Sequence, residues 1–251
     1  VVVAGMQVPL AESEVQALEA WLDNGGSLIV MYEPHPLTRF GDTPDPLADL
    51  LAKWGITLNN DFVIDPNVNP ASFAVSDTAA YARHPITEKM MGLNSVYPTA
   101  RSITLGSETG GASLTPLVVT GFNAWGETDF TSIDQNQVNY VEGEDNAGPL
   151  TLAVAAENFT TGGRLVVFGD SEFAADALYS RGNGDILINA IDWAAEQEDL
   201  INLTPKPTMP RTFTAPGTFG FIGIILTSLC FIPLMVIGGG VWAWVSRRRR
   251  G

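Results

Sequence analysis

The stretch VVVAGMQVPLAESEVQALEAWLDNGGSLIVMYEP, residues 1–34, decides the fold. Val1 to Ala4 predicts a buried strand, and the apolar residues of Leu10 to Asp23 recur at helical spacing. Gly25 and Gly26 end this helix, and Ser27 to Tyr32 predicts a second, mostly apolar strand. Because the connections are short, the unit should form a right-handed parallel crossover. The stretch therefore predicts an α/β fold.

The residues that follow predict a mixture of helices and strands. Asp45 and Pro46 are typical of a helix N-cap and first helical position, and this helix should run to Trp54. Asp65 to Tyr81 is polar and predicts a loop or excursion, and Gly184 to Glu196 predicts a final helix. The segment from His84 to about Asn146 is more β-like, so we expect a β-rich middle insertion. The predicted strands are Phe62 to Ile64, Ser102 to Leu105, Leu117 to Thr120, Leu150 to Ala156 and Arg164 to Phe168, the last two joined as an antiparallel hairpin.

An uncharged segment near the C-terminus predicts one transmembrane helix, residues 217–246. Phe219 to Val245 contains no charged residue and exceeds the roughly 20 apolar residues that cross a bilayer. A basic tail, residues 247–251, carries Arg247, Arg248, Arg249 and Arg250, and by the positive-inside rule this end is cytoplasmic. The alternative is a buried core helix, but such helices seldom run so long without a charge.

This orientation predicts a protein of the cell membrane with its main domain outside. Residues 1–202 would form the extracytoplasmic domain, and residues 203–216, which contain four prolines, a semi-rigid stalk. Because the chain opens on a strand that reads as buried, we expect an upstream portion to be missing.

Acidic residues dominate the predicted outer part. The chain has a formal net charge of −15; nine of its 13 basic residues and all 28 acidic residues precede Gly217, so that part carries −19. Such a surface repels nucleic acid and anionic headgroups. We therefore expect no nucleic-acid partner.

Residues for common catalytic and cofactor sites are few. The single cysteine, Cys230, lies in the apolar run, and His35 and His84 are the only histidines. The sequence has neither a G-x-S-x-G elbow nor a glycine-rich phosphate loop. We expect no catalytic residue, no metal and no cofactor.

Two small groups of polar and aromatic residues are candidate contacts. Glu33 and His35 follow one predicted strand, and Asp170 and Glu172 follow another, so they could meet at the carboxyl edge of the sheet, where α/β folds bind ligands. The alternative is solvated loop residues, with Asp170 or Ser171 as a helix cap.

Trp125 and Glu127 form the second group, in a predicted loop after a strand. An aromatic residue there indicates either local packing or contact with a partner.

Several segments together resemble the auxiliary component of an uncharacterised ABC-type transport system, the gliding-motility GldG-like group. They span most of the chain in order: residues 1–34, DPLADLLAKWGITLNNDFVIDP, ARS at Ala100 to Ser102, AWGETD at Ala124 to Asp129, GGRLVVFGDSEFAADAL and NAIDWAAEQEDLI. The resemblance implies an extracytoplasmic domain related to the glutamine-amidotransferase-like (Rossmann-like) fold without its catalytic cysteine. It also implies association with an ABC permease and ATPase.

Three functional hypotheses follow. The first is a non-enzymatic accessory subunit of an ABC-type transport system, whose outer domain binds a partner or substrate. The second is an envelope hydrolase that uses the acidic edge. The third is a membrane-anchored scaffold or adhesion ectodomain.

Overall fold

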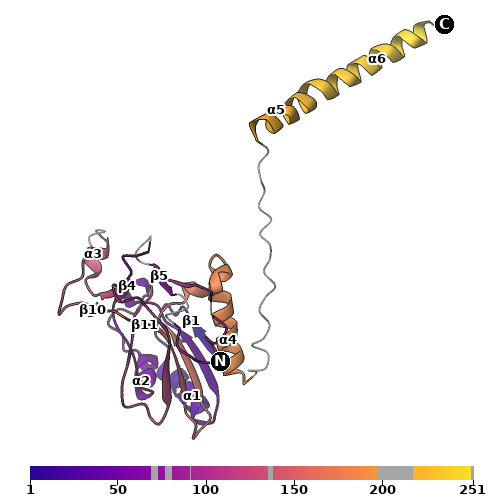
Figure 1. The fold of residues 1–251 in the computed structure, drawn as a ribbon. Coiled ribbons are helices and arrows are strands. Elements are labelled where there is room, and N and C mark those ends of the chain that lie inside the picture. The colour runs from indigo at the N-terminus through magenta and orange to yellow at the C-terminus, as the bar shows by residue number, and fades with distance from the viewer. Residues whose placement is uncertain (69–72, 77–80, 91, 135–137, 197–216, 250–251) are drawn as a thin grey trace. The chain divides into compact units, whose positions relative to one another are not determined.

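The opening segment forms the parallel crossover that its sequence predicts. The computed structural model describes residues 1–68, 73–76, 81–90, 92–134, 138–196 and 217–249. Strand β1 (Val2–Ala4), helix α1 (Glu12–Asp23) and strand β2 (Ser27–Met31) follow one another, and β1 and β2 are parallel (Figure 1). β1 is more exposed than expected, with Val2 at 53%, because it lies at the edge of the described sheet.

The central sheet combines parallel and antiparallel strands. Its further strands are β3 (Ile56–Leu58), β7 (Ile103–Leu105), β8 (Ser113–Val119), β11 (Thr151–Glu157) and β12 (Arg164–Phe168). The order is β1-β2-β12-β11-β7-β3, and β8 also pairs with β11. β12 runs parallel to β2, whereas β11 and β12 form the predicted antiparallel hairpin. The middle of the chain thus supplies two strands, β7 and β8, to the main sheet.

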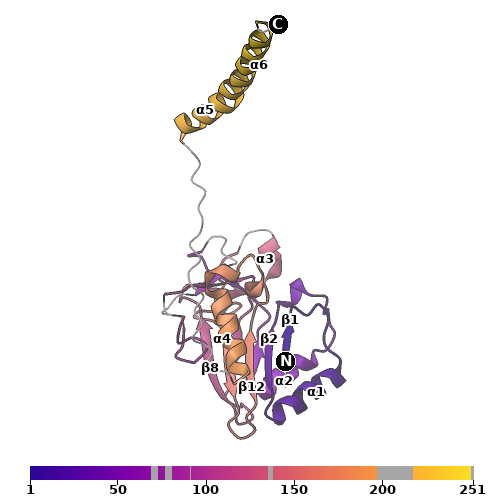
Figure 2. The same cartoon turned by 90° about the vertical axis from the view of Figure 1, so that its right-hand side faces the viewer.

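Helices cover both faces of this sheet (Figure 2). α1 and α2 (Pro46–Lys53) pack on one face and α4 (Gly184–Ala194) on the other. Side chains of β2 alternate between them: Leu28 and Val30 join the core under α1 and α2, and Ile29 and Met31 the core under α4. Burying each such side chain stabilises the fold by about 1.5–3 kcal/mol. The mixed α/β class is confirmed, and the glutamine-amidotransferase likeness stays a prediction.

The helix starts follow from local chemistry. Asp45 caps α2 as predicted, since its side chain accepts the N–H of Ala48 at 3.4 Å and Pro46 occupies the first helical position.

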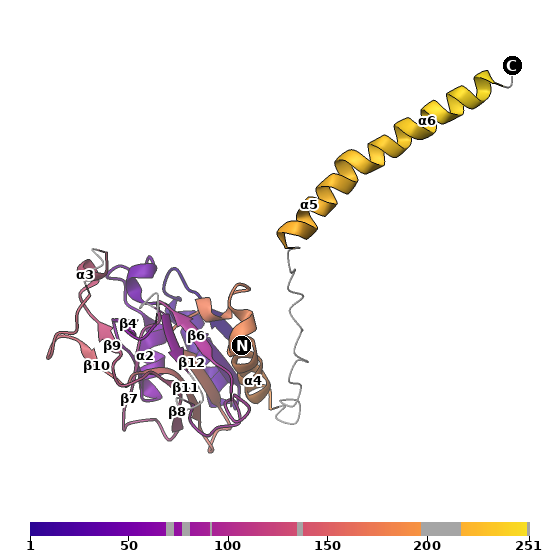
Figure 3. The same ribbon diagram turned by 45° about the horizontal axis from the view of Figure 1, so that its top comes forward.

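Two small sheets and a short helix extend one end of the domain (Figure 3). One sheet contains β10 (Asn146–Ala147), β9 (Trp125–Glu127) and β4 (Phe62–Ile64), and the other pairs β5 (Phe73–Ser76) with β6 (Ser95–Pro98). α3 spans Phe130–Asp134. β5 lies in the segment predicted as a loop or excursion; its partner β6 is distant in sequence, so local pattern alone did not reveal it.

The C-terminal unit, Pro205–Gly251, is separate from the unit Val1–Thr204. It contains α5 (Thr218–Leu226), a π-helical turn (Thr227–Phe231) and α6 (Ile232–Arg248). Within it, Phe221–Arg248 is long and apolar enough to cross a membrane, and an 18-residue window of this stretch has a mean hydropathy of 2.5. The predicted stalk, residues 203–216, lies outside the described residues.

We expect Gly169→Ala to destabilise the α/β domain strongly. A Cβ at residue 169 would lie 2.1 Å from the backbone oxygen of Arg101, and the N–H of Arg101 bonds to the Gly169 oxygen at 2.8 Å, so neither backbone segment can move away freely. Overpacking of this kind costs about 1–3 kcal/mol or more, which denaturant unfolding will measure.

Gly121→Ala is the matched control, because a Cβ there meets no heavy atom within 4 Å. Equal loss of stability in the two variants would show that the close approach at Gly169 is unimportant.

Candidate functional site

Two of the predicted carboxylates meet at the carboxyl ends of neighbouring parallel strands. Glu33 follows β2, and Asp170 follows β12. The backbone N–H of Ser171 donates to Glu33 Oε1 at 2.8 Å, and the Ser171 hydroxyl donates to the same oxygen. Asp170 Oδ1 accepts the N–H of Glu172 at 2.7 Å. Asp170 therefore fixes the turn that follows β12, whereas Ser171, at the N-cap position of the short 3-10 helix Glu172–Ala174, makes no side-chain capping bond.

This carboxyl pair is enclosed by protein. Glu33 is 6% exposed and Asp170 is fully buried. Their second oxygens, Glu33 Oε2 and Asp170 Oδ2, have no hydrogen-bond partner within the described structure. Burial, and then the nearby charge of Glu33, raise the pKa of Asp170 well above its usual range. The site thus favours a proton on Asp170.

Arg101 binds the same edge of the sheet, although sequence reasoning did not select it as a site residue. Its guanidinium donates to three backbone oxygens: Asn59 at 2.7 Å, Leu58 at 3.2 Å and Glu33 at 3.3 Å. Burial lowers the pKa of Arg101 to about 10, so it is charged at neutral pH. Its only signal in the sequence was its place in the quoted ARS segment.

Asp61 is a further buried residue that the sequence did not point to. It accepts the N–H of Ser102 at 2.8 Å, the Ser102 hydroxyl at 2.5 Å and the side-chain amide of Asn146 at 2.8 Å. A Cβ on Gly126 would lie 2.0 Å from Asp61 Oδ2, so β9 approaches this carboxylate closely. Asp61 thereby links the main sheet to the β9–β10 sheet.

His35 and Glu172, the other two residues of the predicted acidic edge, have different surroundings from Glu33 and Asp170. The His35 ring lies 5.5 Å from that of Phe40, and burial, followed by the charge of Arg101, lowers the pKa of His35. Glu172 is exposed, and its backbone rather than its side chain bonds to Asp170. The enclosed part of the predicted acidic edge is therefore Glu33 with Asp170.

Trp125 and Glu127 lie in strand β9, not in the loop that the sequence predicted. The three-residue strand is held by pairing with β4 and β10, which a local pattern does not show. Trp125 Nε1 donates to Glu127 Oε2 at 3.3 Å, and Glu127 is 3% exposed. Glu127 is thus packed within the domain, and a role of Trp125 or Glu127 in partner contact stays a prediction.

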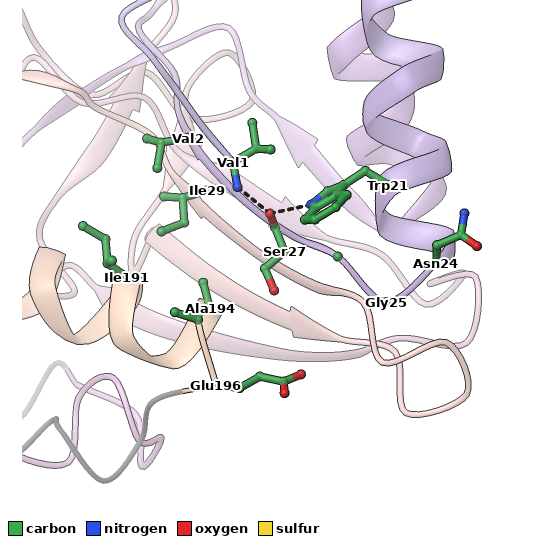
Figure 4. Close-up of a pocket in the computed structure, with 12 residues that line it drawn as sticks. Val1, Val2, Trp21, Asn24, Gly25, Ser27, Ile29, Ile191, Ala194 and Glu196 are labelled. Carbon is green, nitrogen blue, oxygen red and sulfur yellow. Dashed lines mark hydrogen bonds between the residues drawn. The ribbon is translucent and has the colours of Figure 1, made fainter.

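A hollow of about 510 Å³ lies at the amino ends of β1 and β2 (Figure 4). Trp21 forms one wall, and its Nε1 donates to the Ser27 oxygen at 3.0 Å; Ile191 and Ala194 of α4 form the opposite wall. Because Ser27 begins β2 and Glu33 follows it, this hollow lies at the other end of the strand from the carboxyl pair. None of the predicted site residues lines it.

The described side chains give no ready metal centre. Within the described ranges, no group of three or more His, Cys, Asp or Glu residues is placed to hold a metal ion. Glu33 and Asp170 supply two carboxyl groups, whose first oxygens are already bound by the turn after β12. The second oxygens of these two carboxyl groups have no partner within the described structure, so either can carry a proton.

We expect Asp170→Asn to remove a pH-dependent loss of stability. Because the pKa of Asp170 is raised in the folded protein, ionisation of this carboxyl group lowers the free energy of unfolding. This loss of stability is absent below the ordinary aspartate pKa of about 3.9, and it grows as the pH rises toward the raised pKa. The replacement asparagine keeps an oxygen for the Glu172 N–H and does not ionise. The stability of the variant relative to the wild type should therefore rise with pH, by up to about 1.4 kcal/mol per pH unit.

Unfolding by denaturant from about pH 4 to about pH 8 measures this difference. Asp176→Asn, at an exposed position, is the control. Parallel stability curves for the wild type and Asp170→Asn would contradict a raised pKa.

Comparisons with known proteins agree with the fold and extend the sequence resemblance. No curated protein matches the chain. A solved structure described as "mmIFT52 N-terminal domain" is similar in fold, with a TM-score of 0.56, 20% identity, and coverage of 77% of this chain and 75% of that one. The family described as "ABC-type uncharacterized transport system" matches residues 1–192. The chain belongs to this family of ABC-type transport auxiliary proteins.

Proposed function

We propose that this protein is a non-enzymatic, membrane-anchored accessory subunit of an ABC-type transport system. Its outer domain binds a partner or substrate, and its helix docks with the permease, which works with an ATPase subunit. The observation that carries this proposal is the family match over residues 1–192 in a chain that also contains the apolar helix Phe221–Arg248.

The enclosed carboxyl pair supports a non-enzymatic role. A general acid or base must come within hydrogen-bond reach of its substrate. Asp170 is fully buried and Glu33 nearly so, and both are held by the turn after β12. These groups are placed to hold β2 and β12 together at their carboxyl ends, and the family resemblance carries over no catalytic residue.

Charge supports the proposed orientation. The four arginines Arg247–Arg250 come directly after Ser246, at the end of the uncharged segment, and no acidic residue lies after Gly217. Lys206 and Arg211, on the other flank, are outnumbered. Basic residues beside a membrane helix are retained on the cytoplasmic side. The acidic domain therefore lies on the extracytoplasmic side of the cell membrane, which is the plasma or inner membrane.

Co-purification tests the transport role. A tagged protein, extracted from its own membranes with its native upstream and downstream sequence, should bring down an ABC permease and ATPase. Removing the segment from residue 217 onward should abolish recovery of the permease, whereas Asp170→Asn should leave it unchanged. Failure to recover either transporter subunit would contradict the proposal.

Cysteine labelling tests the orientation. In a Cys230→Ser background, a cysteine at the exposed Glu108 should react with a membrane-impermeant maleimide in intact cells. A cysteine in place of Gly251 should react only after the cells are opened. The reverse labelling pattern would place the domain in the cytoplasm and refute the proposed orientation.

A further inference from the structure

An aromatic hollow lies beside strands β9 and β10. Figure 3 shows these two strands at the end of the domain where α3 and β4 also lie. The hollow measures about 320 Å³. Its lining residues are Phe122, Asn123, Ala124, Trp125, Tyr140, Ala147 and Gly148. Residues 122–125 form one side of the hollow, and Tyr140, Ala147 and Gly148 form the other. The β9–β10 pairing joins the two sides, with Ala147 opposite Trp125. A Cβ on Gly148 would lie 2.3 Å from the Ala124 oxygen, so the segments are in close contact and the hollow is preformed.

Its aromatic side chains are exposed yet partly fixed in place. Phe122 is 85% exposed and Tyr140 is 45% exposed. The rings of Trp125 and Tyr140 meet edge to face, with centroids 6.4 Å apart, and Trp125 Nε1 donates to the buried carboxylate of Glu127 at 3.3 Å. Large exposed aromatic groups of this kind are typical of binding surfaces, and Trp and Tyr contribute most to binding energy.

The part of the chain that supplies the lining of the hollow is acidic in sequence. Residues 102–163 contain eight acidic residues and no lysine or arginine. The turn between Tyr140 and β10 carries Glu142, Glu144 and Asp145. Asp145 accepts the N–H groups of Val141 at 2.7 Å and Thr128 at 3.1 Å, whereas Glu142 and Glu144 are exposed. The faces of aromatic rings attract cations, and the carboxylates add to this attraction.

We propose that this aromatic hollow binds a basic segment of a partner protein, with a Lys or Arg side chain against the rings and its charge toward Glu142 and Glu144. The inference rests on the proposed partner-binding role of the outer domain and names the surface and the partner's chemistry. An anionic lipid surface fits poorly, since these carboxylates repel it. A second copy fits poorly as well, because a two-fold contact would bring two identical acidic surfaces together.

Peptide binding to the full chain in detergent tests this directly. The probe is a fluorescein-labelled peptide that alternates arginine with leucine, and its matched counterpart has glutamate in place of each arginine. Fluorescence anisotropy gives the dissociation constants. The arginine peptide should bind, and Phe122→Ser should weaken it roughly tenfold. The double variant Glu142→Gln, Glu144→Gln should weaken it and reduce its salt dependence.

The chain offers matched controls for both changes. Phe159 is also highly exposed, at 75%, but lies in the turn between β11 and β12, and Glu108 is an exposed acid in the same acidic stretch. Phe159→Ser and Glu108→Gln should leave the dissociation constant unchanged. Because the substituted side chains are all exposed, circular dichroism should show equal folding.

Four results would overturn the inference: no binding of the arginine peptide, equal binding of the glutamate peptide, equal weakening by Phe159→Ser, or a dimer that Phe122→Ser dissociates. If the arginine peptide does not bind while the transporter subunits still co-purify, the inference about the hollow is wrong and the proposed transport role stands. If the peptide binds in the expected way while no transporter subunit co-purifies, the transport role fails instead.

Discussion

The guanidinium of Arg101 holds together chain segments that are far apart in the sequence. It donates to the backbone oxygens of Glu33, after β2, and of Leu58 and Asn59, at the end of β3. These two strands lie far apart in the order of the central sheet. The Arg101 backbone also bonds to Gly169, after β12. One buried cation thus fixes the carboxyl edge at which Glu33 and Asp170 meet.

That cation also explains how the domain accommodates buried acids. Burying an unpaired carboxylate is costly. The charges of Asp61, Asp45 and Glu33 act on Arg101 and partly offset the effect of burial on its pKa. Asp61 is further satisfied by Ser102 and Asn146, whereas Asp170 is neutralised most simply by a proton. Asp61 and Asp170 are therefore accommodated in different ways, the first by hydrogen bonds and the second by a proton.

The sequence predicted those parts of the fold that depend on short-range pattern. Periodicity and turn residues located β1, α1 and β2, and the short loop between β11 and β12 predicted their hairpin. The convergence of Glu33 and Asp170 was also predictable, because side chains after neighbouring parallel strands share one edge.

Features that depend on distant partners were not predictable from local pattern. The partners of Arg101 are backbone oxygens as many as 68 positions away, so no residue pattern marks them. Strand β9 has only three residues, and its strand partners begin at Phe62 and Asn146. Local pattern therefore predicts a loop at Trp125, whereas the pairing with these distant partners makes it part of a strand.

The position of an acidic side chain decides what it can do in this domain. Glu33 and Asp170 are engaged by the protein's own backbone and enclosed, so they hold the turn after β12 in place. Glu142 and Glu144 are exposed in the turn that follows Tyr140, and residues 102–163 contain no lysine or arginine. The negative charge there is available to a partner, and the aromatic rings add an attraction that solvated carboxylates lack on their own. If the domain faces outward as proposed, this is the part of the described surface best suited to recognise a basic protein segment at the membrane.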